Sequence, residues 1–216
     1  MRRHLIKRET DLQIISEWIE NGDSVLDIGC GRGILLEHLI RTRAVRALGV
    51  DTDLSKVGSC LKRSVPVYHG DAEALLREFP DQSFDWVVLS RTIQELRNPG
   101  SLISQAIRVA ENVAVGFVNQ GFWLNRWSTL LTGSRPTNDV FPLTWDEGHP
   151  YNPVTISGFE AFARRKEIHL ANAVFLKGDW QTRTSRMPNL RAGYALYHIR
   201  SLIRIAPSSR EYSVWT

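Results

Sequence analysis

The sequence feature that most constrains the fold is a glycine-rich loop between a short apolar segment and an apolar helical pattern. Residues 24–28 predict a buried strand, Gly29, Gly31 and Gly33 follow at alternate positions, and residues 34–41 place leucines at helical spacing. A strand that ends in glycines before a helix directs backbone N–H groups at a ligand. In open α/β sheets, such ligands lie beyond the carboxyl ends of the strands. The loop therefore predicts an α/β sheet with a ligand site at this edge.

The first 120 residues repeat this alternation of strand and helix. Strands are expected at 24–28, 47–51, 65–69, 84–90 and 112–118, and helices at 10–20, 34–41, 54–62, 72–78 and 99–110. This alternation predicts a parallel, doubly wound sheet, and strands that are apolar on both faces belong in its middle. A later helix at 157–166 and strands near 171–176 and at 193–200 predict an antiparallel C-terminal hairpin. The expected fold class is a Rossmann-like, mostly parallel α/β sheet.

Chain length and pattern indicate one domain with an insertion. The 216 residues suit a single domain over 1–216. Residues 119–155 hold many aromatic side chains among glycines and prolines, without a clean period, so we expect an insertion or lid there. Residues 178–192 are expected to form a long turn between the last two strands.

Charge and cysteine content exclude several classes of function. The net charge is +4, with basic residues gathered toward the ends rather than in a stripe interleaved with aromatics, so nucleic acid is not a favoured partner. Two cysteines without zinc spacing predict neither a metal site nor a disulfide framework. Neither a signal peptide nor a membrane span is evident, and a cytoplasmic location is expected.

The acid that precedes the glycines favours a cationic cofactor. Asp27 stands two residues before Gly29. Unit charges about 4 Å apart interact by roughly 4 kcal/mol near a protein surface, which disfavours a pyrophosphate beside this carboxylate. S-adenosylmethionine carries a sulfonium and an ammonium group and no phosphate. The sequence therefore predicts S-adenosylmethionine as the cofactor, with S-adenosylhomocysteine as its product.

Two more acids follow the next two predicted strands. Asp51 can accept hydrogen bonds from ribose hydroxyls, and Asp71 can accept one from the adenine amino group. The alternative for each acid alone is a helix N-cap or a turn residue. The expected cofactor-binding residues are Asp27, Gly29, Cys30, Gly31, Gly33, Asp51, Thr52, Asp71, Ala72, Ser90 and Arg91.

The catalytic residues are left unassigned by the sequence. Methyl transfer from a sulfonium needs mainly positioning and exclusion of water, and a general base is optional. No obvious base follows the fourth predicted strand. His149 and Tyr151 are the candidates for a general base. The alternative for His149 is a loop residue without a catalytic role, and the alternative for Tyr151 is packing of the lid onto the sheet. Cys30 is expected to pack under the cofactor, with a reactive thiol as the alternative.

Several segments resemble known families. Val25–Gly33 is similar to the first motif of class I methyltransferases, and Leu89–Gln94 and Phe117–Trp127 resemble segments of the MetW family of methionine biosynthesis proteins. Arg91 and Val118 depart from that family, which usually has Gln and Pro there. The resemblance implies a homoserine O-acyltransferase as partner.

Three functions are therefore carried forward: a small-molecule methyltransferase, an activator subunit that binds S-adenosylmethionine, and, as the alternative, an RNA or protein methyltransferase.

Overall fold

Seven strands form one mixed sheet in the computed structural model, which describes residues 2–134, 136–137 and 151–202, with side chains from residue 10 onward. The strand order is β3-β2-β1-β4-β5-β7-β6, and β7 runs antiparallel to both of its neighbours. The strands are β1 Ser24–Ile28, β2 Arg46–Asp51, β3 Val67–His69, β4 Phe84–Ser90, β5 Ala110–Val118, β6 Leu170–Lys177 and β7 Ala192–Arg200. This arrangement confirms the predicted fold class, a mostly parallel sheet with an antiparallel C-terminal hairpin.

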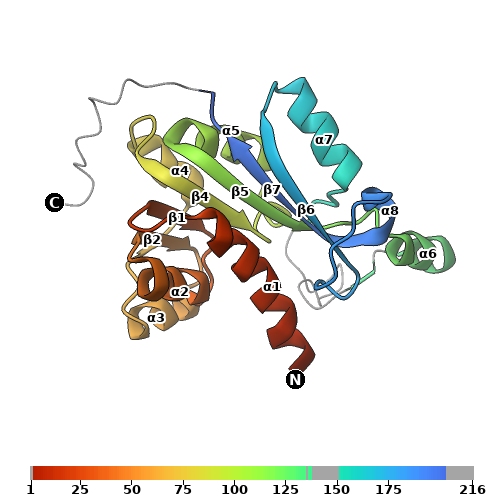
Figure 1. Cartoon of the computed structure of the whole chain (residues 1–216), viewed down its shortest axis with the longest axis horizontal. Helices are drawn as coiled ribbons and strands as arrows, with labels where there is room; N and C mark the ends of the chain where they lie inside the picture. Colours follow the sequence, from red (N-terminus) through yellow and green to blue (C-terminus); the bar gives the residue numbers. More distant parts are fainter. Residues whose placement is uncertain (1, 135, 138–150, 203–216) are drawn as a thin grey trace.

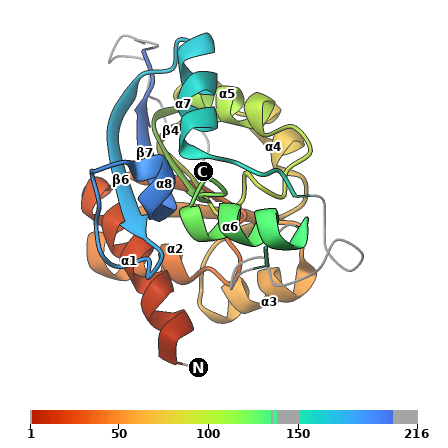
Figure 2. The same ribbon diagram turned by 90° about the vertical axis from the view of Figure 1, so that its right-hand side faces the viewer.

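Helices cover both faces of the sheet (Figures 1 and 2). They are α1 Arg2–Trp18, α2 Ile34–Arg43, α3 Leu54–Lys62, α4 Ala72–Glu78, α5 Pro99–Val109, α6 Trp123–Thr132, α7 Ile156–Arg165 and α8 Pro188–Arg191. One apolar cluster packs α1, α2 and α3 against one face, and a second packs α4, α5 and α7 against the other. Burial on both sides explains why β1 and β4 are apolar along almost their whole length.

Short polar residues start several of the helices. The Asp53 carboxylate accepts hydrogen bonds from two backbone N–H groups of α3, and Asp71 accepts one from Ala74 N in α4. The Thr155 hydroxyl accepts one from Gly158 N in α7. These caps satisfy N–H groups that have no partner within the helix, and they fix where each helix begins.

Several bounds differ from the expected elements by one or two residues, and the structure departs from the prediction more clearly in four places. The first helix begins at Arg2 rather than near residue 10, and β3 begins at Val67, directly after a proline that cannot donate to the ladder. Helix α8 lies within the expected long turn. Helix α6 lies within residues 119–155, where no helix was predicted, and it buries none of its side chains. Residues 138–150 of the expected lid lie outside the described residues, so the lid stays a prediction.

In the part of the chain that the structure describes, no helix is both long enough and apolar enough to cross a bilayer.

Candidate functional site

The glycine loop leaves β1 in a backbone conformation that favours glycine. Gly29, Gly31 and Gly33 have φ of 71°, 58° and 72°. A Cβ at Gly29 would lie 2.4 Å from Thr92 Oγ1, and one at Gly33 would lie 3.0 Å from Cys60 Sγ. A Cβ at Gly31 would meet nothing within 4 Å. Packing therefore excludes a side chain at the first glycine and crowds one at the third, whereas the second borders open space where a ligand can approach the backbone.

Asp51 ties this loop to the end of the neighbouring strand. It is the last residue of β2, and its side chain is buried. Its carboxylate accepts hydrogen bonds from Gly31 N at 2.9 Å and from Asp53 N at 2.9 Å. A carboxylate offers about four lone-pair sites, so each oxygen can still accept a further hydrogen bond from a ligand.

Asp27 is a buried carboxylate without a donor. It lies on β1 and is 4% exposed. No donor among the described residues lies within hydrogen-bonding distance of its carboxylate, and burial together with the charge of Asp51 raises the pKa of Asp27 to about 7. Ionisation at this place is costly unless a cation approaches it. The carboxylate is therefore suited to a positively charged ligand group.

Asp71 and its neighbour line the next strand end in a different role. The Asp71 side chain is exposed and caps α4, which was the structural alternative for this residue, and Ala72 is the first residue of α4. The Thr52 carbonyl lies 3.1 Å from His69 Nε2. One Asp71 oxygen accepts the cap bond, which leaves the other oxygen for a ligand.

Cys30 faces away from the open side of the loop. Its Sγ lies 3.9 Å from Cys60 Sγ, and a Cβ on Gly49 would lie 2.7 Å from it. Burial and the charge of Asp27 raise the pKa of the Cys30 thiol. A thiolate nucleophile needs a lowered pKa, so the packing role is favoured over the reactive-thiol alternative.

Ser90 and Arg91 at the end of β4 contact α1 and β7. Arg91 Nη2 donates to Asp11 Oδ2 at 2.8 Å, and the guanidinium lies over the rings of Trp180 and Tyr194 at 5.2 and 5.6 Å. Ser90 Oγ lies 3.1 Å from the Tyr194 hydroxyl. Burial raises the pKa of Asp11 despite this ion pair. Both predicted residues thus lie at the expected strand end, but their side chains are held by protein groups.

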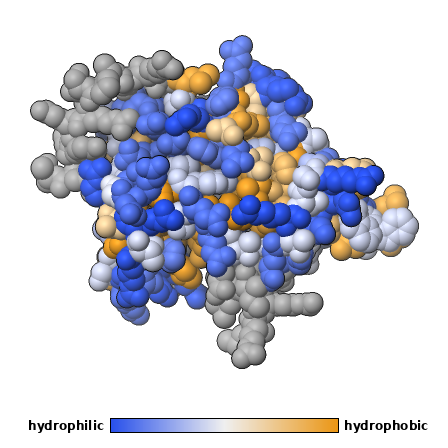
Figure 3. Space-filling model, in the orientation of Figure 1, coloured by the Kyte–Doolittle hydropathy of each residue, from blue (hydrophilic) through white to orange (hydrophobic). Residues whose placement is uncertain are grey.

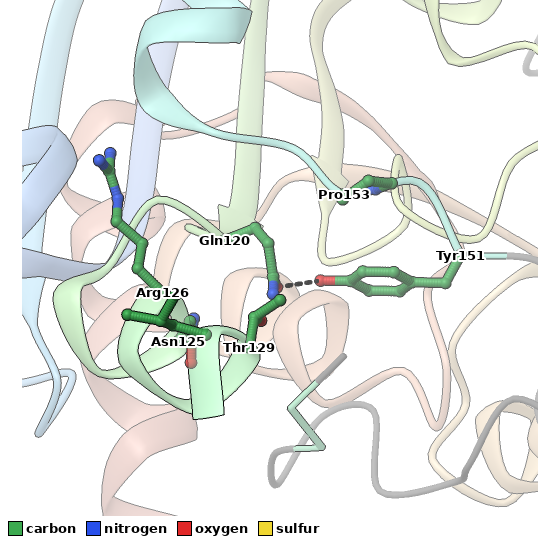
Figure 4. A pocket seen from close by; sticks show the side chains of 7 residues that line it. Gln120, Asn125, Arg126, Thr129, Tyr151 and Pro153 are labelled. Carbon is green, nitrogen blue, oxygen red and sulfur yellow. Dashed lines mark hydrogen bonds between the residues drawn. The ribbon is translucent and has the colours of Figure 1, made fainter. Parts of the chain in front are cut away.

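An open, shallow cavity of about 760 Å³ lies beyond the end of β5, and Tyr151 lines it (Figure 4). The Tyr151 hydroxyl accepts a hydrogen bond from Gln94 Nε2 at 2.6 Å and donates one to Gln120 Oε1 at 3.4 Å. Helix α6 forms the opposite wall through Asn125, Arg126, Thr129 and Leu130. Figure 4 shows the Arg126 side chain directed away from Tyr151. His149 lies outside the described residues.

Three structurally important polar residues escaped the sequence analysis as site residues. The Thr92 hydroxyl donates to Ile28 O and packs on Gly29, so it fixes the start of the glycine loop. Gln94 is fully buried and pairs with both the N–H and the C=O of Val118. The Asp11 side chain is buried. The sequence carries one signal for this residue, because an acid stands there on the apolar face of the predicted first helix.

Comparison with known sequences identifies related proteins. The model of the family described as "Methionine biosynthesis protein MetW" matches residues 9–199. A protein named "Bifunctional methionine biosynthesis protein MetXA/MetW", from Rhodopirellula baltica, is 32% identical over 202 residues, which are 88% of this chain and 32% of that protein. This chain thus spans about a third of the length of that relative.

Solved structures share the fold. A SAM-dependent methyltransferase from Archaeoglobus fulgidus has a TM-score of 0.67 and 16% identity, covering 92% of this chain and 94% of that one. A SAM-dependent methyltransferase from Thermotoga maritima, named a possible histamine N-methyltransferase, has a TM-score of 0.64 and 19% identity, covering 93% of each chain. At such identities the likeness establishes the methyltransferase fold alone.

Proposed function

Since this chain belongs to the MetW family of methionine biosynthesis proteins, we propose that it binds S-adenosylmethionine at the glycine loop and acts as an activator subunit of a homoserine O-acyltransferase. The observation that carries the cofactor proposal is Asp27, a buried carboxylate with a raised pKa and no donor among the described residues. It lies behind a loop in which the space at Gly31 is open. A ligand with a cationic group and no phosphate fits a site that combines the buried Asp27 carboxylate with the open space at Gly31.

The residues around the loop fit the other parts of the cofactor. The free lone pairs of Asp51 suit the ribose hydroxyls, and the uncapped oxygen of Asp71 suits the adenine amino group. When bound, S-adenosylmethionine supplies an activated methyl group. The task of this chain is then to bind and orient the cofactor and to exclude water from it.

Two observations favour an activator over an enzyme. The relative from Rhodopirellula baltica carries both MetXA and MetW in its name, which fits two activities that work side by side. The second observation is that the two hydroxyl groups beside the site are already engaged by protein groups. The Tyr151 hydroxyl hydrogen-bonds the side-chain amides of Gln94 and Gln120, and the Ser90 hydroxyl lies 3.1 Å from the Tyr194 hydroxyl and 3.5 Å from Asp11 Oδ2.

The cofactor proposal is tested by replacing the glycine that borders open space. Gly31→Ala is expected to weaken S-adenosylmethionine binding about tenfold or more, because the new methyl group stands where the ligand approaches the backbone. The left-handed backbone at this position also costs about 1 kcal/mol of stability with alanine. Titration calorimetry with S-adenosylmethionine and with S-adenosylhomocysteine measures the loss.

Gly22 offers a matched control for this change. It has φ of 82°, and its Cβ position is also open, but it lies in the turn before β1. Gly22→Ala should therefore reproduce the loss of stability without the loss of binding. Equal affinity in both variants, or no binding by the unmodified protein, would contradict the cofactor proposal.

A second candidate function is methyl transfer to a small molecule held in the cavity beside Tyr151. The cavity adjoins the end of β5 and presents one fixed hydroxyl, which favours this candidate. If it is correct, Tyr151→Phe should slow S-adenosylhomocysteine formation about tenfold, the value of one hydrogen bond. The assay uses S-adenosylmethionine with a protein-free small-molecule extract as the source of acceptor. Unchanged cofactor affinity serves as the control, and turnover that is absent or insensitive to the variant contradicts a role for Tyr151.

A further inference from the structure

Helix α6 carries an apolar stripe that nothing in the described part of the chain covers. The stripe consists of Trp123, Leu124, Trp127, Leu130 and Leu131, which recur at helical spacing on one side of the helix. Trp127, Leu130 and Leu131 are 57%, 75% and 67% exposed. Figure 3 shows apolar and pale side chains at the right-hand end of the molecule, where Figure 1 places α6. A contiguous exposed apolar surface of this kind marks an interaction site.

The helix is held at its first turn and projects from the fold. Asn125 Nδ2 donates to Asn119 O at 3.1 Å, and Arg126 Nε donates to Gly121 O at 2.7 Å. Both acceptors lie between the end of β5 and the start of α6, and Gly133, in the left-handed conformation, caps the end of the helix after Thr132. No α6 side chain is buried, so these two hydrogen bonds, rather than packing of the helix against the core, hold α6 and its apolar stripe in place.

The composition of α6 separates the possible occupants. A helix that lies on a lipid surface carries several Lys or Arg side chains on its polar face. Arg126 is the single charged residue of α6, and its Nε is bonded to Gly121 O. An apolar stripe that contains two tryptophans and no charged residue is instead typical of the buried centre of a protein–protein interface, where charged residues are depleted and tryptophan is enriched.

We infer that the apolar stripe of α6 is the surface through which this chain docks on its acyltransferase, against an apolar, uncharged face of that partner. This inference rests on the activator function proposed above. The partner is favoured over a second copy of this chain because the Rhodopirellula baltica relative is named for MetXA and MetW in a single polypeptide. Segments joined in one chain meet at high effective concentration, so that even a contact of modest area between them is populated.

The test measures binding of the full chain to the homoserine O-acyltransferase of the same organism by interferometry. Trp127→Glu and Leu131→Glu are each expected to raise the Kd about 30-fold, because either change would bury an unpaired charge in the interface. Leu61→Glu is the matched control. Leu61 is 63% exposed on α3, on the other side of the molecule, and its variant should bind like the unmodified protein (Figure 1).

The outcomes distinguish the two proposals. Absence of binding by the unmodified chain overturns the activator function itself, and with it this docking surface. Binding that both α6 variants retain overturns the docking surface and leaves the activator function standing. Sedimentation that shows self-association of the unmodified chain, lost in the α6 variants while the acyltransferase still binds them, assigns the stripe to a second copy and also overturns the inference. Retained S-adenosylmethionine binding by every variant reports that each one is folded.

Discussion

Asp27→Asn is expected to weaken S-adenosylmethionine binding about 100-fold while making the folded protein more stable at about pH 8. Asparagine matches the shape of the aspartate but carries no charge. The variant therefore removes the attraction for a ligand cation, and it also removes the cost of an ionised carboxylate that is buried beside Asp51 without a donor. Calorimetry measures the first effect and urea unfolding the second.

The pH dependence of this effect follows from the direction of the pKa shift. The pKa of Asp27 is raised from 3.8 to about 7 in the folded protein. The folded state therefore holds a proton between these values that the unfolded state has released, and unfolding free energy falls as pH rises across this window. The contribution of the protonated Asp27 carboxyl to the free energy of unfolding is fully present below about pH 4 and is lost above about pH 7. It amounts to at most roughly 4 kcal/mol.

The affinity for a cationic ligand should instead rise with pH. A cation beside Asp27 favours the ionised carboxylate, so binding near neutral pH releases a proton, and affinity rises between about pH 5.5 and 7.5. This range stays below the titration of an α-amino group, at about 7.7 to 8.0. Asp27→Asn should show neither the proton release nor this rise. Two results would contradict the assignment of Asp27 to the cationic part of the ligand. One is a wild-type affinity that does not change over this pH range, and the other is a variant that binds as tightly as the wild type.

Asn119→Asp is expected to lower the free energy of unfolding by about 4 kcal/mol, because two buried donors are replaced by a carboxylate oxygen. Asn119 is fully buried directly after β5. Its Nδ2 donates to Asn189 O at 3.0 Å and to Ala192 O at 2.7 Å, and its Oδ1 accepts from Gly121 N and Ile156 N. The change keeps the side-chain shape, leaves two carbonyl groups without a donor and brings a negative charge against them.

Thermal unfolding should report this change as a fall in Tm of about 10 °C. The deficit should shrink as pH falls, because the introduced carboxyl has a raised pKa and, once protonated, can donate one of the lost hydrogen bonds. Asn172→Asp is the matched control, since Asn172 is exposed and its Oδ1 accepts one local hydrogen bond that aspartate also accepts. Similar stability in the two variants would show that the Asn119 hydrogen bonds contribute little.

Much of the fold was predictable because its signals are local. The bounds of β1, β4, α3 and α4 agree with the sequence prediction residue for residue, since strands buried on both faces read as continuous apolar runs and Asp53 and Asp71 mark the helix starts. Helix α6 escaped prediction for the converse reason. Its apolar stripe is not part of the core, and the glycines, prolines and aromatic residues around it obscured the period.

The candidate site was predictable as a set of positions but not as a set of contacts. The spacing of Gly29, Gly31, Asp51 and Asp71 depends on strand ends that meet at one edge of a parallel sheet, so the sequence alone placed them near one another. Which side chains stay available for a ligand depends on partners that are distant in sequence. Arg91 is held by Asp11, which lies 80 residues earlier in the chain.

The sequence by itself determined the α/β architecture, the place of the glycine loop after the first strand and the family resemblance, because each rests on local periodicity or on short motifs. The tertiary structure alone decided that Asp27 has no donor among the described residues, that Cys30 faces Cys60 instead of the open side of the loop, and that the α6 stripe is exposed. The physical reason is that burial, hydrogen bonding and charge are fixed by residues from separate segments. Their effects on pKa and on accessible surface exist only once the sheet has brought those segments together.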